Sequence, residues 1–215
     1  MAMFSNGGSG VNTYAKFNSK LGKFVIRDGD KKTEFSQVKD IKLTKAGLRD
    51  GDYEGTPYTE LLLRVEGEDG VAQLAFNVAT GACARFVSIL NGADLSKPMG
   101  FSGQLLKVGH VFKPGDKPLE NDYVSISVFQ DGSPEGYLKP TAEVPKVTML
   151  EVKSKTGAVL KEVADTSERD AFVREQIALL TEKLAKLSHA DGTNEAGDGE
   201  SIPAGNEPPD DDIPF

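Results

Sequence analysis

Apolar and polar side chains alternate along most of the chain between residues 20 and 163, the period of two that predicts half-buried β-strands. Phe24 and Ile26 stand between charged neighbours, and Ala72, Leu74 and Phe76 share one face of a later segment. Strands are therefore expected over residues 34–44, 59–66, 71–79, 101–111 and 122–130, with additional strands near residue 25 and over 144–152 and 158–163.

Three segments depart from this alternation. Residues 81–90 carry apolar side chains at helical spacing, so a short helix is expected there. Residues 47–57, rich in Gly and Asp, and residues 109–121 are expected to be long loops. This order of strands, loops and helix is that of the OB-fold, a five-stranded barrel that binds ligands with strands two and three and two of its loops. A mainly β, OB-fold-like barrel with extra strands is predicted, with another small barrel or a sandwich as the alternative.

Charge is distributed unevenly along the 215 residues, although the formal net charge is −8. Eight of the 33 acidic residues lie in 191–215, which has no Lys or Arg, so the remaining 25 acids balance the 25 basic residues. Ten basic and four acidic residues lie between Lys16 and Arg49. A basic block and an acidic end suggest a body that attracts phosphate, while a solvated surface with a solubilising tail is the other interpretation.

Features that the sequence lacks indicate the compartment and argue against cofactors. It has no basic stretch followed by an apolar run at its start and no eighteen consecutive apolar residues, so a cytoplasmic protein without a membrane partner is expected. A phage-encoded protein acting in the host cytoplasm would also fit. Cys83 is the only cysteine and the histidines are His110 and His189, so no disulfide, metal site or cofactor is expected.

Cations and aromatic rings occur together in both predicted loops. Binding of single strands without sequence choice needs cations that follow the phosphates and rings on which bases stack. In the last predicted strand Val124, Ile126 and Val128 face the core, which turns Tyr123 and Phe129 outward. Core packing is the competing explanation for each ring. The residues expected to contact single-stranded DNA are Lys42, Lys45, Arg49, Tyr53, Tyr58, Arg64, Lys107, Phe112, Lys113, Lys117, Tyr123 and Phe129.

The most specific signal is the end of the chain, which consists of Asp210, Asp211, Asp212, Ile213, Pro214 and Phe215. This ending, with its Gly-, Asp- and Glu-rich linker, resembles the acidic C-terminal tip of bacterial and phage single-stranded DNA-binding proteins. The resemblance implies protection of single strands in DNA replication, recombination or repair, and recruitment of replication and repair proteins through the tip. An exposed Phe ring beside a free carboxylate also suits a partner pocket lined by apolar and basic groups.

Four regions follow from these patterns. Residues 1–15 are expected to be a flexible arm, 16–164 an OB-like DNA-binding domain, 165–190 an amphipathic helix and 191–215 a disordered acidic tail for protein partners. The helix carries one apolar stripe formed by Val173, Ile177, Leu180, Leu184 and Leu187. We expect this stripe to pack on its own barrel, and pairing with a second copy in a homodimer is the alternative.

Patterns typical of enzymes are missing from the sequence. It has no phosphate-binding Gly-rich loop, no zinc-protease motif and no nucleophile elbow. Residues 50–55 begin like a calcium loop, but the twelfth position is Leu61, which cannot supply the required carboxylate. A non-enzymatic DNA-binding protein is predicted. The alternatives are a non-enzymatic adaptor whose barrel binds protein and, less favoured, a magnesium-dependent nuclease using scattered carboxylates.

Overall fold

The computed structural model describes residues 13–68, 70–131, 137–153 and 159–190. Its elements are β1 (Thr13–Asn18), β2 (Lys23–Asp28), β3 (Lys31–Phe35), β4 (Gln37–Tyr53), β5 (Thr56–Gly67), β6 (Gly70–Asn77), α1 (Gly81–Leu90), β7 (Met99–Leu106), β8 (Tyr123–Phe129), β9 (Thr148–Lys153), β10 (Val159–Asp165) and α2 (Ser167–Ala190). The predicted class, mainly β with a C-terminal helix, is confirmed. The predicted tail lies outside the described residues, and β1 begins inside the segment expected to be a flexible arm.

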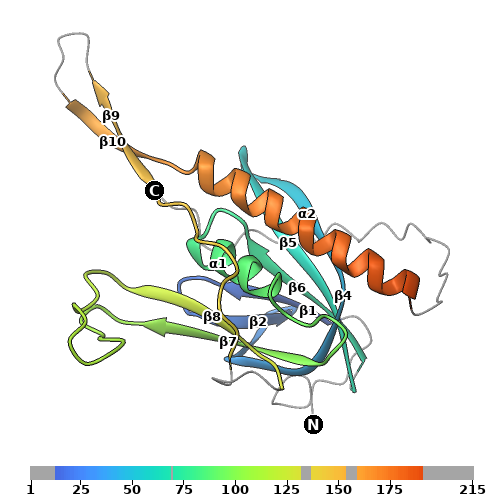
Figure 1. The fold of residues 1–215 in the computed structure, drawn as a ribbon. Helices are drawn as coiled ribbons and strands as arrows, with labels where there is room; N and C mark the ends of the chain where they lie inside the picture. Colours follow the sequence, from blue (N-terminus) through green and yellow to red (C-terminus); the bar gives the residue numbers. More distant parts are fainter. Residues whose placement is uncertain (1–12, 69, 132–136, 154–158, 191–215) are drawn as a thin grey trace.

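Eight strands form one strongly curled sheet in the order β3-β2-β1-β6-β5-β4-β7-β8. Neighbouring strands are antiparallel except β1 and β6, which run parallel. β9 and β10 form a separate two-stranded sheet that projects from the body beyond the start of α2 (Figure 1). The curled sheet therefore has the shape of a half-barrel, with α1 and α2 lying against it.

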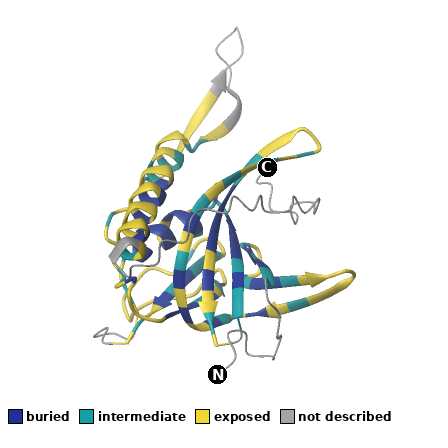
Figure 2. Cartoon of the chain, turned by 90° about the vertical axis from the view of Figure 1, so that its right-hand side faces the viewer, coloured by how far each residue is buried: buried dark blue, intermediate teal, exposed yellow. Residues whose placement is uncertain are grey.

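The core fills the space between the curled sheet and the two helices (Figure 2). Rings from β1, β2, β6, α1 and β7 follow one another with centroids 4.7–6.0 Å apart; they belong to Phe17, Phe24, Phe76, Phe86 and Phe101. Edge-to-face and offset contacts at this spacing stabilise a core beyond simple area burial. The α2 stripe closes this core, with Val173, Ile177, Leu180 and Leu184 buried in it. The stripe thus packs on the chain's own sheet, as the sequence led us to expect.

The prediction that residues 47–57 form a loop is wrong. β4 and β5 continue through it as one antiparallel ladder that reaches the pair Tyr53–Thr56. Glu54 and Gly55 alone make the turn, with φ values of 51° and 80°. Positive φ at both central residues is the two-residue hairpin geometry that matches strand twist. Gly and Asp disfavour strands on average, but here the ladder hydrogen bonds and the tight turn outweigh that preference.

The curled sheet brings the β1–β2 turn close to β7, backbone against backbone. The turn is held by Asn18, whose side-chain oxygen accepts hydrogen bonds from the backbone N–H groups of Lys20 and Leu21, each at 2.9 Å. A Cβ on Gly22 would lie 2.6 Å from backbone atoms of β7, and one on Gly103 would lie 2.5 Å from the Gly22 oxygen. Only glycine lets the two backbones approach this closely.

We expect Gly22→Ala to lower the free energy of unfolding by about 1–3 kcal/mol more than Gly29→Ala, because overpacking adds to the cost of positive φ. The two glycines have similar φ values, +64° and +56°, but nothing lies within 4 Å of a Cβ on Gly29. Gly103→Ala should likewise cost more than Gly47→Ala, which also has open space. Urea unfolding of the four variants measures the differences, and equal losses within each pair would contradict a close seam.

Candidate nucleic-acid interface

The face of the sheet opposite the core, here called the outer face, carries two predicted cations side by side. In the ladder Lys45 of β4 pairs with Arg64 of β5, and Arg64 pairs in turn with Gln73 of β6. Both cationic side chains are exposed, and neither has an ion-pair partner among the described residues. Like charges directly opposite each other on neighbouring strands destabilise a sheet. An anionic ligand at this pair would remove the repulsion.

A buried carboxylate on the outer face engages another predicted cation. Glu60, whose side chain is 3% exposed, lies 3.2 Å from the Lys16 ammonium and 2.5 Å from the Arg49 guanidinium. Arg49 also donates a hydrogen bond of 2.9 Å to the Tyr14 hydroxyl. Burial alone would lower the pKa of Arg49, but the hydrogen bonds and charges of Glu60 and Tyr14 raise it above its ordinary value. Arg49 was expected from the sequence to contact DNA. Its positive charge is instead balanced by Glu60 within the sheet.

Sequence reasoning missed the other members of this cluster. Lys16, Tyr14 and Glu60 come from β1 and β5, and only the pairing of β1 beside β6 brings the first two near β5. The available signal was a charged residue, Glu60, at the start of the apolar run 61–63. A carboxylate at such a position requires cationic partners, because an unpaired buried charge is very unfavourable.

The β4–β5 hairpin is acidic at its tip, in the segment that the sequence showed to be rich in Gly and Asp. Tyr58 lies against its own hairpin, since a Cβ on Gly51 would be 2.5 Å from the Tyr58 ring. Tyr53 is half-buried close to the turn. Carboxylates come from Asp50, Asp52 and Glu54. The tip would therefore repel phosphate, unlike the base of the same hairpin around Lys45.

The β7–β8 connection has an ordered base, although it is a loop as predicted. The Lys107 ammonium lies 2.7 Å from the Asp122 carboxylate, which also accepts the backbone N–H of Val108 at 3.0 Å. These two hydrogen bonds hold the pKa of Asp122 below its ordinary value. Further out, Gly109 and Leu119 are joined by a backbone hydrogen bond of 2.8 Å. The connection is thus a braced arm, here called the β7–β8 arm.

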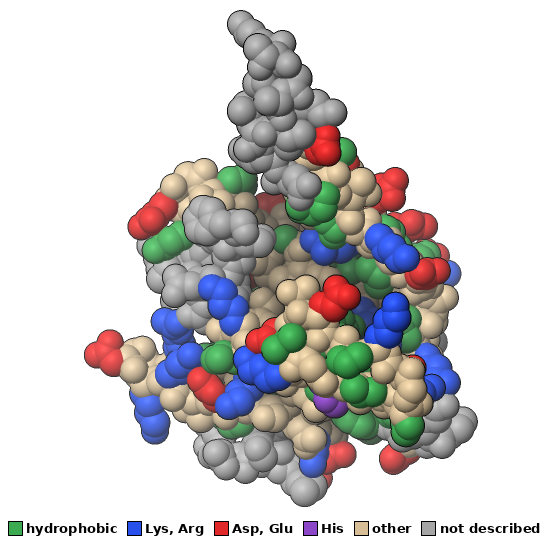
Figure 3. Space-filling view, turned by 90° about the vertical axis from the view of Figure 1, so that its left-hand side faces the viewer, with side chains coloured by type: hydrophobic (Ala, Val, Ile, Leu, Met, Phe, Trp, Pro, Cys, Tyr) green, Lys and Arg blue, Asp and Glu red, His purple; other side chains and the backbone are tan. Residues whose placement is uncertain are grey.

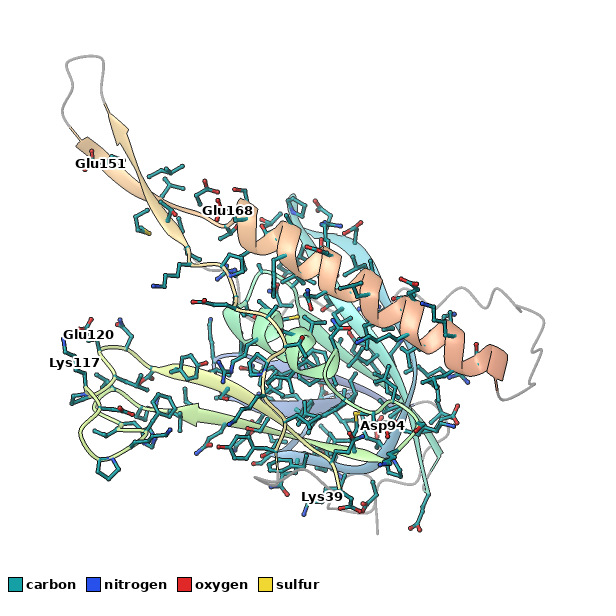
Figure 4. The ribbon with its side chains drawn as sticks, in the orientation of Figure 1. Lys39, Asp94, Lys117, Glu120, Glu151 and Glu168 are labelled. Atoms are coloured by element: carbon teal, nitrogen blue, oxygen red, sulfur yellow. The ribbon has the colours of Figure 1, made fainter. Side chains whose placement is uncertain are left out.

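Aromatic rings meet on the β7–β8 arm. Phe112, 55% exposed, lies edge-on between His110 and Tyr123, with centroids 5.3 and 6.0 Å away. Lys113 and Lys117 are exposed on the same arm, and Lys117 lies at its tip (Figure 4). Viewed from the side toward which the arm projects, cationic and hydrophobic side chains lie next to each other (Figure 3). The arm thus presents an exposed ring with an edge contact on each side, among the exposed cations Lys113 and Lys117 and the exposed acids Asp116 and Glu120.

The strand β8 confirms the predicted inward and outward positions. Ile126 and Val128 are buried and Val124 packs against the core, whereas Phe129 is 39% exposed on the opposite face. The predicted contact residues consequently fall into two groups. One group is on the β7–β8 arm and β8, comprising Lys107, Phe112, Lys113, Lys117, Tyr123 and Phe129; the other is on the β4–β5 outer face, comprising Lys42, Lys45, Arg49, Tyr53, Tyr58 and Arg64.

We expect Glu60→Gln to lower the free energy of unfolding by about 1–3 kcal/mol, since it weakens charge-assisted hydrogen bonds to two cations. Glu66→Gln is the matched control because Glu66 is an exposed acid on the same strand. Its effect should stay within about 0.5 kcal/mol. Urea unfolding of both variants makes the comparison. A Glu60 variant as stable as its control would mean that the cluster contributes nothing to the sheet.

In the described parts of the chain, no three or more His, Cys, Asp or Glu side chains gather as metal ligands. None of the helices there combines the length and the apolar character that a membrane span requires. Comparisons of the chain with protein-family models, with curated proteins and with solved structures found no match.

Proposed function

We propose that this chain is a non-enzymatic protein that binds single-stranded DNA without sequence preference, in replication, recombination or repair. The observation that carries the proposal is the β7–β8 arm, where the exposed Phe112 ring is held by His110 and Tyr123 beside Lys113 and Lys117. A ring fixed in advance loses little freedom when a base stacks on it, and stacking contributes about 1–3 kcal/mol per base. Neighbouring ammonium groups can follow the phosphates.

The order of elements supports an OB-fold at the centre of the sheet. β4 pairs with both β5 and β7, and α1 lies between β6 and β7 in the chain. In this fold the ligand lies on strands two and three, between the loop joining strands one and two and the loop joining strands four and five. Those parts correspond here to β5 and β6, the β4–β5 turn and the β7–β8 arm. β1, β2 and β3 would then be additions beyond β6.

The C-terminal tip, outside the described residues, adds the second half of the proposal. Its resemblance to the acidic tip of single-stranded DNA-binding proteins supports recruitment of replication and repair proteins through Asp210, Asp211, Asp212, Ile213, Pro214 and Phe215. The acidic, Gly-rich composition of the 25 residues from Asp191 to Phe215 predicts a disordered tail, and a disordered chain of that length would have an end-to-end distance of roughly 25–30 Å. The tip could therefore reach the cationic surface and compete there with phosphates. A protein with this role would act in the cytoplasm, including that of a phage host.

An adaptor that binds protein rather than DNA is the second candidate, because one surface favours it. The projecting β9–β10 hairpin exposes Met149, Leu150 and Val163 at 54%, 50% and 41%. Two-stranded hairpins alone are marginally stable in water, so apolar side chains exposed on one suit a protein partner. The absence of any binding to single-stranded DNA would favour this candidate.

Fluorescence titration with an oligothymidine strand tests DNA binding, and Phe112→Ala should weaken it by about 1–3 kcal/mol if a base stacks on that ring. Val108→Ala removes an equally exposed apolar side chain from the same arm and should leave affinity unchanged. Lys113→Gln and Lys117→Gln should each reduce the slope of log affinity against log salt by about 0.7 for a lost phosphate contact. Wild-type affinity that does not respond to salt would contradict the proposal.

Deletion of residues 210–215 should tighten binding of single strands by about fivefold or more at low salt, because competing carboxylates are removed. The gain should fade above about 0.15 M salt, where charges are screened beyond about 8 Å. Phe215→Ala keeps the carboxylates and should lose partner recruitment with unchanged DNA affinity. If the truncated protein bound DNA no more tightly than the full chain, the tail would act in recruitment alone.

A further inference from the structure

The outer face of β7 and β8 forms a strip with an aromatic ring at each end. Tyr123 begins the strip beside Phe112 of the arm, and Phe129 ends it, paired across the ladder with Gly100. The strip spans seven ladder pairs, from Leu106–Tyr123 to Gly100–Phe129, so its ends are roughly 20 Å apart at 3.4 Å per residue. The outward residues between the ends are uncharged; they are Ser102, Gln104, Ser125 and Ser127.

A β-bulge in β4 places a cation at the Phe129 end. Val38 pairs with Phe101 and Ile41 pairs with Met99, so Lys39 and Asp40 together face the single residue Gly100. Asp40 has φ of 52°, which marks the distortion. Bulges change the direction in which side chains point. Both Lys39 and Asp40 are consequently exposed, whereas strict alternation would have turned one of them toward the core.

Gly100 lies between Lys39 and Phe129 and is covered by β4, since a Cβ on it would be 3.1 Å from the Val38 oxygen. A Cβ on Gly100 would lie 3.9 Å from Cγ of Lys39, so the lysine stem passes beside this glycine. Phe129, on the other side of Gly100, is 39% exposed. Lys39, Gly100 and Phe129 thus form one row across three strands, with a cation and a ring flanking a residue without a side chain. This is the same pairing of cation and ring that Phe112 and Lys113 provide on the arm.

We propose that Lys39 and Phe129 form a second base-and-phosphate subsite, and that a single strand runs from the β7–β8 arm along the outward strip of β8 to reach it. This inference rests on the proposed function, because it assumes that the strip binds single-stranded DNA. Hydroxyl and amide groups along the strip offer hydrogen bonds to phosphates without the repulsion that carboxylates would cause. Acids also lie at this end of the strip: Asp40 is next to Lys39, Asp131 follows Phe129 by two residues, and Asp94, which pairs with Lys97, is hydrogen-bonded to Gln130.

A length series of oligothymidines tests the second subsite. A stacked strand advances about 3.4 Å per nucleotide, so roughly six nucleotides are needed to cover 20 Å, while three are too few. Phe129→Ala should weaken binding of a dodecamer by about 5–150-fold and leave the weak binding of a trimer, followed by NMR titration, unchanged. Lys39→Gln should reduce the salt slope for the dodecamer by about 0.7, and Lys39→Arg should restore it.

Lys186→Gln is the matched control, because Lys186 is an exposed lysine paired with an acid, Glu182, on α2 and does not belong to the sheet. It should alter neither affinity nor salt slope. If Phe112→Ala weakened dodecamer binding but Phe129→Ala and Lys39→Gln did not, the second subsite would be refuted while the proposed function stood. If the wild-type protein bound no oligothymidine of any length, both would fall. Near-ultraviolet circular dichroism of each variant checks that the fold is retained.

Discussion

The curl of the eight-stranded sheet depends on one close approach of backbone to backbone. Gly22 in the β1–β2 turn and Gly103 in β7 lie where a single additional carbon on either would meet main-chain atoms at 2.5–2.6 Å. Because a side chain cannot be accommodated there, the two backbones can come this close only with glycine at both positions. The curled sheet has an interior, which α1 and α2 fill, and an exterior, to which nearly all the charged side chains are confined.

On this exterior, the charged residues that become neighbours are set by which strands pair, not by their order along the chain. Glu60 belongs to the outer face, but its carboxylate is almost fully buried there because Lys16 and Arg49 lie against it. The Lys45–Arg64 pair is the opposite case, two like charges brought together by the ladder without a described counter-ion. The first arrangement balances the charge of a buried group, whereas the second places two exposed like charges on neighbouring strands.

The two hairpins that project from the sheet differ in their chemistry. The β4–β5 hairpin ends in a tight turn surrounded by carboxylates, while the β7–β8 arm is longer, is braced by Lys107 and Asp122, and carries a ring flanked by two others. Bracing matters because a ring that is already in position loses less conformational entropy on binding, so more of the stacking energy contributes to affinity. The uncharged strip along β8 then links this arm to the Lys39 end of the sheet.

From the sequence, alternation was enough to predict most strand positions, the inward side chains of β8 and the apolar stripe of α2, because burial on one face imposes a regular period. It missed β1 and the break between β3 and β4. Composition misled at residues 47–57, where hydrogen bonding to β5 holds Gly and Asp in a strand. Three features were decided by tertiary structure: the pairing of β1 with β6, the buried position of Glu60, and the bulge that exposes Lys39. Each depends on residues far apart in the chain meeting across the sheet, and a local pattern carries no information about which strands become neighbours.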